Sequence, residues 1–222
     1  MKILTVSDEE APMFWDYYTP GKLAKYDLIL SSGDLKAEYL RFLVTMARCP
    51  VLYIHGNHDS DYDQDGPDGC DCIDDKLIVY KGLRILGLGG SRRYNNSTYQ
   101  YTEAQMRRRI RKLKRAVKLA GGVDIVLAHA APLGVGDGED IPHRGFSAFL
   151  DLIDACRPRY FLHGHVHLRY GMKIPRQRHY RDTEVINCCG YVELDCQPEE
   201  RELPKNSFWQ KLTARNYLNM DI

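Results

Sequence analysis

The sequence of 222 residues lacks long apolar runs, an excess of charge of one sign, and internal repeats. No apolar stretch approaches the roughly 20 residues that a membrane-spanning helix needs, so we expect no membrane as a partner. Lys and Arg number 31 against 30 for Asp and Glu, which gives a net charge of +1. This balance does not favour nucleic acid or an anionic surface as a partner.

Cysteine is present but not in the spacing of a disulfide-rich secreted module. The seven cysteines are an odd number, and we expect them to be reduced thiols. The first residues enter an apolar strand pattern at once, without the charged and apolar regions of a signal peptide. These features predict a cytoplasmic protein. After Pro198 the pattern weakens, so we expect one domain over residues 1–198 and a peripheral tail over 199–222.

Apolar runs of strand length recur along the chain, and helical patterns separate several of them. The predicted strands lie at 2–6, 28–31, 51–54, 83–88, 123–128 and 159–162. Helices are predicted over 37–48, from Thr102 onward and over about 146–156, because apolar residues share one helix face there. Two late segments, 184–187 and 191–194, indicate a hairpin of strands around Gly190. Strands alternating with helices indicate a layered α/β domain.

Side chains that can bind metal ions follow five of the predicted strands. Imidazole, amide and carboxylate groups at a rigid sheet edge are what a metal site needs. The candidate ligands are Asp8, Glu10, Asp34, Asn57, His129, His165 and His167. Seven ligands are too many for one tetrahedral site, and a shared carboxylate at Asp34 suits two divalent ions about 3.5–4 Å apart. His165 and His167 are expected in a turn, where each can serve a different ion.

These motifs carry a family resemblance. The series Asp8-x-Glu10, Gly33-Asp34, Gly56-Asn57-His58-Asp59, His129 and Gly164-His165-x-His167 resembles the calcineurin-like metallophosphoesterases from residue 3 to about 195. The resemblance implies an α/β fold, a four-layer α/β/β/α sandwich with a metal pair at the strand ends. It implies one metal bound by Asp8, Asp34 and His167, and another bound by Asp34, Asn57, His129 and His165. It also implies that His58 faces the scissile phosphate and that Asp59 orients His58.

Glu10 departs from the family pattern, since most members carry His at this position. In one interpretation Glu9 or Glu10 caps the following helix and one metal site is lost. In the interpretation we favour, Glu10 binds through its carboxylate, because carboxylates suit Mg, Mn and Ca. The added negative charge favours Mn²⁺ over Fe, Zn, Mg or Ni, and phosphodiesters over multiply charged monoesters.

The sequence therefore predicts a metal-dependent phosphoesterase, with a phosphodiester as the favoured substrate. A hydroxide bridging the two metals is expected to attack phosphorus in line, and His58 is expected to protonate the leaving oxygen. The partner is expected to be a small-molecule phosphoester. The alternative is a non-catalytic scaffold on the same fold with a degenerate metal site, which Glu10 favours and the other ligands oppose.

Several further motifs have simpler interpretations. Residues 107–118 are strongly basic, but their apolar stripe accounts for a helix whose basic face is solvated, so a nucleic-acid-binding module is the weaker hypothesis. Cys70 and Cys72 lack a partner pair and form a poor zinc motif. His55, His143 and His163 are expected to be structural.

Overall fold

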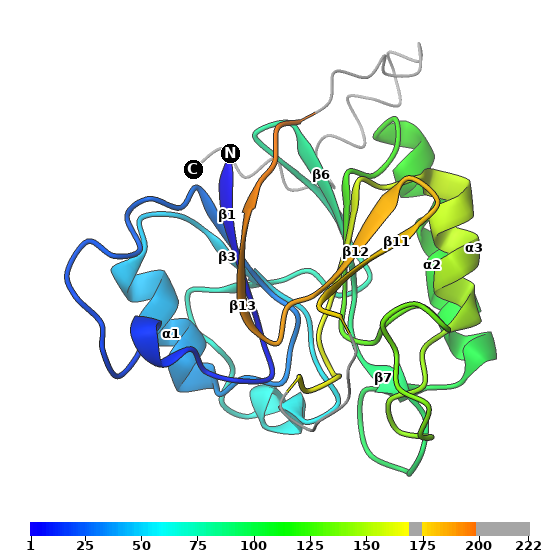
Figure 1. Cartoon of the computed structure of the whole chain (residues 1–222), viewed down its shortest axis with the longest axis horizontal. Helices are drawn as coiled ribbons and strands as arrows, with labels where there is room; N and C mark the ends of the chain where they lie inside the picture. The colour runs from blue at the N-terminus through cyan, green and yellow to red at the C-terminus, as the bar shows by residue number, and fades with distance from the viewer. Residues whose placement is uncertain (169–174, 199–222) are drawn as a thin grey trace.

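The computed structural model describes residues 1–168 and 175–198 (Figure 1). The predicted tail at 199–222 lies outside the described residues. Within the described ranges, no helix is both long and apolar enough to cross a bilayer. All seven cysteines are free thiols.

The first sheet holds the N-terminal strands and the last strand. Its order is β13-β1-β2-β3-β4, formed by Gly190–Asp195, Lys2–Ser7, Leu28–Ser31, Val51–Tyr53 and Asp71–Cys72. The four strands from β1 to β4 are parallel, and β13 is antiparallel to β1. Helix α1 (Ala37–Met46) and the short 3₁₀ helix η1 (Pro12–Phe14) pack on the outer side of this sheet.

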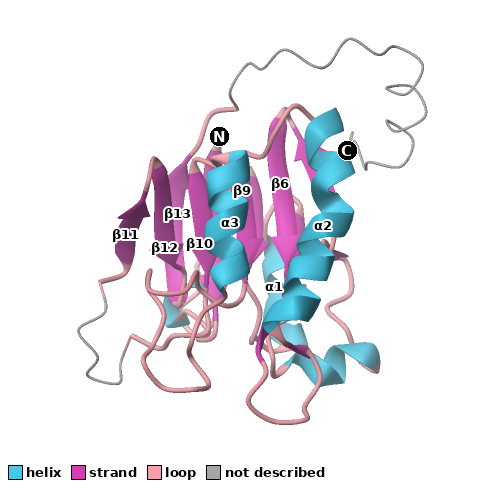
Figure 2. Ribbon diagram, turned by 90° about the vertical axis from the view of Figure 1, so that its right-hand side faces the viewer, coloured by secondary structure: helices cyan, strands magenta, loops and turns pink. Residues whose placement is uncertain are grey.

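The second sheet has the order β11-β12-β10-β9-β6-β5. Its strands are Gln177–Tyr180, Thr183–Asn187, Tyr160–His163, Ile125–Ala128, Leu83–Leu88 and Leu77–Tyr80. The inner four are parallel and the two outer strands are antiparallel. Figure 2 shows α2 (Glu103–Leu119) and α3 (Ser147–Cys156) lying over the outer face of this sheet. The strands β7 (Ser91–Arg92) and β8 (Gln100–Tyr101) form a small parallel pair.

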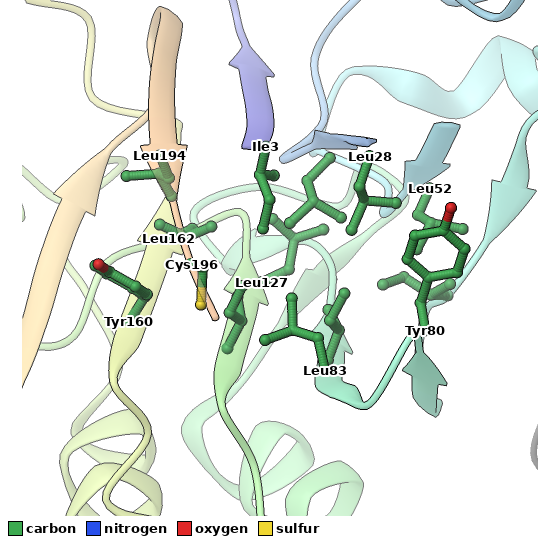
Figure 3. Close-up of a cluster of buried hydrophobic side chains, with 14 of the residues drawn as sticks. Ile3, Leu28, Leu52, Tyr80, Leu83, Leu127, Tyr160, Leu162, Leu194 and Cys196 are labelled. Atoms are coloured by element: carbon green, nitrogen blue, oxygen red, sulfur yellow. The ribbon is translucent and has the colours of Figure 1, made fainter. Parts of the chain in front are cut away.

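The two sheets face each other across the central apolar layer. Figure 3 shows side chains from both sheets meeting there, among them Ile3, Leu28, Leu127 and Leu162. Neighbouring residues on the same strands point outward, because successive side chains of a strand alternate between faces. Since both faces of the central parallel strands are covered, these strands are largely apolar. The order of layers is helix, sheet, sheet, helix, so the predicted four-layer α/β/β/α sandwich is confirmed.

The predicted helices form close to the expected positions. Helix α2 begins at a capping box, in which the Thr102 side chain accepts from the Gln105 backbone and the Gln105 side chain accepts from the Thr102 backbone. Its buried side chains include Met106 and Ile110. One arginine of the basic segment is not solvated. Arg109 is buried, donates to the Gly89 carbonyl at 2.6 Å and lies over the ring of Tyr101.

The predicted hairpin around Gly190 is wrong. Strand β12 pairs with β10 and β11 in the second sheet, whereas β13 pairs with β1 in the first. The chain crosses between the sheets at Cys188 and Cys189, and Gly190 adopts a positive φ of 74° at the start of β13. Two short apolar segments joined by a glycine have the same local pattern whether they pair with each other or with distant strands.

Candidate metal centre

The carboxyl ends of the parallel strands of both sheets meet at one edge of the molecule, at the bottom of Figure 1 near β7. Five of these strand ends carry the predicted ligands. The backbone at Asp8, Asp34 and His165 has φ values of 61°, 56° and 67°, in the left-handed region that non-glycine residues seldom adopt. Strain of this kind persists only where the surrounding structure imposes it, and it gathers at functional sites.

His129 is the most buried member of the group. Its Nδ1 donates to the Ser32 carbonyl at 2.7 Å, which turns Nε2 toward the ligands. That Nε2 lies 3.1 Å from Asn57 Oδ1 and 3.2 Å from Asp34 Oδ2. Donor atoms of Asp34, His129 and His165 all lie within 4.8 Å of one another. Four of the predicted ligands are therefore close together.

His165 is fixed on both sides. Its Nε2 donates to the Pro142 carbonyl at 2.8 Å, which leaves Nδ1 for the site. Its backbone nitrogen donates to the Asp8 carboxylate, at 2.9 and 3.0 Å from the two oxygens. Because β10 ends at His163, both His165 and His167 lie beyond the strand, as expected. Asp8 and His165 therefore belong to one hydrogen-bonded unit.

Beside His167 lies a carboxylate that the sequence did not single out as a metal ligand. Glu9 Oε1 lies 3.6 Å from His167 Nδ1, and Cys189 joins these two residues within the same 4.8 Å limit. Glu10 Oε1 instead lies 3.7 Å from the Lys36 amine. A ligand role for Glu10 stays a prediction, and Glu9 and Cys189 are further candidates. The spacing of residues along the chain could not identify Cys189 as a candidate ligand, because its position near His167 depends on where the chain crosses between the sheets.

The Asn57-His58-Asp59 turn presents one exposed and two buried side chains. His58 is exposed, and its backbone nitrogen donates to Asp34 Oδ1 at 2.8 Å. The buried carboxylate of Asp59 accepts from the backbone nitrogens of Gly56 at 2.7 Å and Asp34 at 2.9 Å. Asp59 therefore joins two ligand-bearing loops. Its predicted role in orienting the His58 side chain stays a prediction.

Glycine is required where these loops touch. A methyl group at Gly33 would overlap the Gly56 backbone nitrogen, and one at Gly164 would overlap Ser7 Oγ and the Asp8 carboxylate. Gly33 also has a φ of 92°, which favours glycine. The glycines of two motifs thus allow the sheet edges to approach.

The electrostatics of the site favour a cation. Burial raises the pKa of Asp8. Burial opposes the charged form of Asp34 too, but the charge and hydrogen bond of His129 hold the pKa of this carboxyl well below its usual range. Burial lowers the pKa of His129, yet the Asp34 carboxylate and the charge of Asp8 raise it to about 10. The carboxylates therefore draw positive charge into a buried position, and the mixed oxygen and nitrogen donors fit a divalent ion.

Two side chains that the ligand motifs do not include flank the centre. The Asn57 amide nitrogen donates to the Tyr94 hydroxyl at 3.2 Å. The ring of His143 lies 5.1 Å from the ring of His165, and its Nδ1 lies 2.7 Å from Asp140 Oδ2. The loops that carry Tyr94 and His143 are therefore part of the walls around the ligands.

Comparison with known proteins gives a family. A family model described as calcineurin-like phosphoesterase matches residues 10–169. The chain belongs to the calcineurin-like phosphoesterase family, which uses divalent metals.

Two curated relatives and one solved structure extend this comparison. A lariat debranching enzyme of Caenorhabditis briggsae is 26% identical, with 85% of this chain and 48% of that protein covered. A UPF0046 protein of Caenorhabditis elegans is 29% identical, with 65% and 35% covered. The chain thus spans less than half the length of either relative. The crystal structure of TT1561 of Thermus thermophilus matches with a TM-score of 0.54 at 15% identity, covering 85% of this chain and 88% of that one. This likeness supports the fold.

Proposed function

We propose that the chain hydrolyses a phosphodiester at a centre of two divalent cations, with Mn²⁺ as the favoured ion. The proposed ligands are Asp8, Asp34, Asn57, His129, His165 and His167, with the Glu9–Glu10 pair supplying a further carboxylate. The observation that carries the proposal is the convergence of Asp34, Asn57, His129 and His165 around one point of the sheet edge. Two divalent ions, when bound, activate a water for in-line attack and offset the charge that develops on the phosphate oxygens.

The residues of this chain have separable roles in the proposal. Asp34 connects the loops that carry the ligands, since its carboxylate contacts His129 and its backbone nitrogen donates to the Asp59 carboxylate. In this proposal His58 protonates the leaving oxygen, and two observations support the role: its backbone is held by Asp34, and its side chain is exposed. The buried Ser32 carbonyl and Pro142 carbonyl fix the two imidazoles in the tautomers that ligand binding needs.

Two points support a diester over a monoester. Asp8, Asp34 and the glutamate pair place several carboxylates at the edge, which disfavours a substrate carrying two negative charges on its phosphate. The similarity to a lariat debranching enzyme, a phosphodiesterase, agrees with this preference. We propose a small phosphodiester as the substrate. We also propose that the protein acts in the cytoplasm, because its cysteines are free thiols and free thiols persist there.

The proposal is tested by removing metal with a chelator, restoring Mn²⁺, and timing hydrolysis of bis-p-nitrophenyl phosphate beside the corresponding monoester. We expect metal-dependent turnover that is faster on the diester. Asp34→Asn is the control, and it should lose activity together with bound metal. A protein that binds no metal and hydrolyses neither compound would instead be the scaffold alternative.

A further inference from the structure

A second group of metal-type donors lies beside the metal centre, where the two sheets are joined. His55 follows β3 and Cys72 ends β4, both in the first sheet. Asp74 forms a parallel bridge with Gly87 of β6, in the second sheet. We call His55, Cys72 and Asp74 the junction cluster. We propose that the junction cluster is a zinc-binding site, separate from the phosphoesterase centre.

The donor atoms of the junction cluster lie near the positions that one zinc ion requires. His55 Nδ1 lies 2.7 Å from Asp74 Oδ2 and 3.8 Å from Cys72 Sγ, and all three donors lie within 4.8 Å of one another. Tetrahedral zinc bonds of about 2.0 Å to nitrogen and 2.3 Å to sulfur separate those two ligand atoms by about 3.5 Å. The imidazole and the thiolate are therefore almost in place. The Asp74 oxygen needs to move back by about 0.7 Å.

Neighbouring groups hold two of the donors in this arrangement. The Gly89 backbone nitrogen donates to Asp74 Oδ1 at 2.7 Å, which leaves Oδ2 turned toward His55. The His55 ring stacks on Tyr99, with 4.3 Å between ring centroids and 8° between the planes. Side chains fixed before a ligand binds lose little conformational freedom on binding, which raises affinity.

Charge and access are also suitable. A thiolate and the Asp74 carboxylate together balance the two charges of Zn²⁺. The nearest positive groups are Arg109, whose Nη2 lies 4.0 Å from Asp74 Oδ1, and Lys76, whose amine donates to the Cys72 carbonyl at 2.7 Å. Arg109 Nε is itself paired with Asp75 at 2.8 Å. The His55 and Asp74 side chains are 12% and 17% exposed, so water can reach the cluster and supply a fourth ligand.

The donor chemistry distinguishes the junction cluster from the centre. A thiolate beside an imidazole favours zinc over Mn²⁺ or Mg²⁺, which prefer oxygen ligands. The spacing of Cys70 and Cys72 gives no zinc motif because the partners of Cys72 come from other segments. Cys70 Sγ instead lies 3.6 Å from the Leu40 carbonyl.

Zinc at the junction cluster would stabilise the metal-centre loops as well. The His55 carbonyl accepts from the Gly90 backbone nitrogen at 2.7 Å, and the chain continues from His55 through Gly56 to Asn57. A zinc ion bound by His55 and Asp74 therefore ties the end of β3 to the segment after β4, and Asp74 in turn accepts from Gly89 after β6. Because the cluster exists only in the folded chain, zinc binding raises the stability of the fold.

The test compares the full chain with Cys72→Ser, after chelation, in titrations with Zn²⁺ and with Co²⁺ as the spectroscopic probe. Cobalt bound by a thiolate absorbs in the near ultraviolet through charge transfer, and cobalt bound only by oxygen and imidazole ligands lacks this band. We expect the unaltered chain to show the band and to bind about one zinc ion more than Cys72→Ser. Its zinc-dependent rise in Tm should be larger too.

Two matched controls and a second variant complete the test. Cys70→Ser and Cys189→Ser should both keep the band, and Asp74→Asn should weaken zinc binding by roughly tenfold or more with unchanged circular dichroism. Unchanged absorption and zinc content in Cys72→Ser would overturn the proposal. Loss of the band in Cys189→Ser alone would also overturn it, because the thiolate would then belong to the group around His167. Should Cys72→Ser fail to fold, Asp74→Asn decides the matter.

Discussion

The backbone nitrogen of His165 donates to both carboxylate oxygens of Asp8, a residue 157 positions earlier in the chain. This contact joins the end of β10 in one sheet to the end of β1 in the other. The Gly164 that precedes His165 makes the approach possible, since a side chain there would occupy the position of the Asp8 carboxylate. The geometry of the centre therefore depends on how closely the two sheets meet.

Gly164→Ala should damage both stability and metal binding. The added methyl group overlaps Ser7 Oγ and the Asp8 carboxylate, so the loops must separate. Overpacking of this kind costs about 1–3 kcal/mol, measurable by urea denaturation. Gly66→Ala is the milder control, because its methyl group meets only the Tyr62 carbonyl oxygen, at 3.1 Å, and a shift of a few tenths of an ångström relieves the contact. Equal losses in the two variants would argue against a special role for Gly164.

Glu9→Gln and Glu10→Gln separate the two glutamates as ligands. Glu9 lies 3.6 Å from His167 Nδ1, whereas Glu10 lies 3.7 Å from the Lys36 amine. We expect Glu9→Gln to weaken metal binding by roughly ten- to a hundredfold and Glu10→Gln to leave it nearly unchanged. Metal content after dialysis against Mn²⁺ provides the measurement. The reverse order would support the ligand role that the sequence predicts for Glu10.

His58→Ala should lower kcat by roughly 10²–10⁴ while the metal content stays the same. The reason is that the His58 side chain is exposed at the centre, whereas its backbone, which the substitution keeps, is what contacts Asp34. His179→Ala, at an exposed position of β11, is the control for the loss of an imidazole. If metal is lost together with activity, His58 is a ligand and its proposed role as a proton donor is wrong.

Arg84→Ala should destabilise the fold but leave the residues of the metal centre unchanged. Arg84 Nη1 lies 3.1 Å from Asp124 Oδ1, and the two side chains are only 8% and 3% exposed. Removing the guanidinium breaks this buried ion pair, although the Arg84 backbone nitrogen still donates to Asp124 Oδ2 at 2.8 Å. We expect a cost of about 3–5 kcal/mol in the free energy of unfolding. Arg181→Ala removes an ion pair with Asp154 whose side chains are 68% and 45% exposed, and should change the free energy of unfolding far less, because water already screens this pair. Chemical denaturation of both variants checks the contrast.

The layered fold and the convergence of candidate ligands at one sheet edge could be predicted from the sequence, because each depends on local patterns. Asp34, Asn57 and His129 closely follow apolar strands, and the parallel arrangement then brings strand ends to one edge. The pairing of strands that are distant in the sequence could not be predicted from local patterns. The segments around Gly190 carry the pattern of a hairpin, and only the positions of β1 and β10 separate them into different sheets.

The direction of individual side chains could not be predicted from the sequence either. Glu9 and Glu10 are adjacent and chemically alike, and which one faces His167 depends on the left-handed backbone at Asp8. The junction cluster was missed for a related reason. His55, Cys72 and Asp74 have no spacing that marks a metal site, and they meet because a bridge to β6 carries Asp74 across from the first sheet.

The pairing of β13 with β1 determines when the first sheet can be completed during synthesis. Lys2 pairs with Asp195 and Ser7 with Gly190, so β1 leaves the ribosome long before its partner β13 and keeps one edge unpaired until almost the whole described domain has been synthesised. An unpaired edge can bind other chains, and contacts so distant in sequence form slowly. Asp8, at the end of β1, therefore receives its full surroundings only after His129, His165 and β13 have emerged.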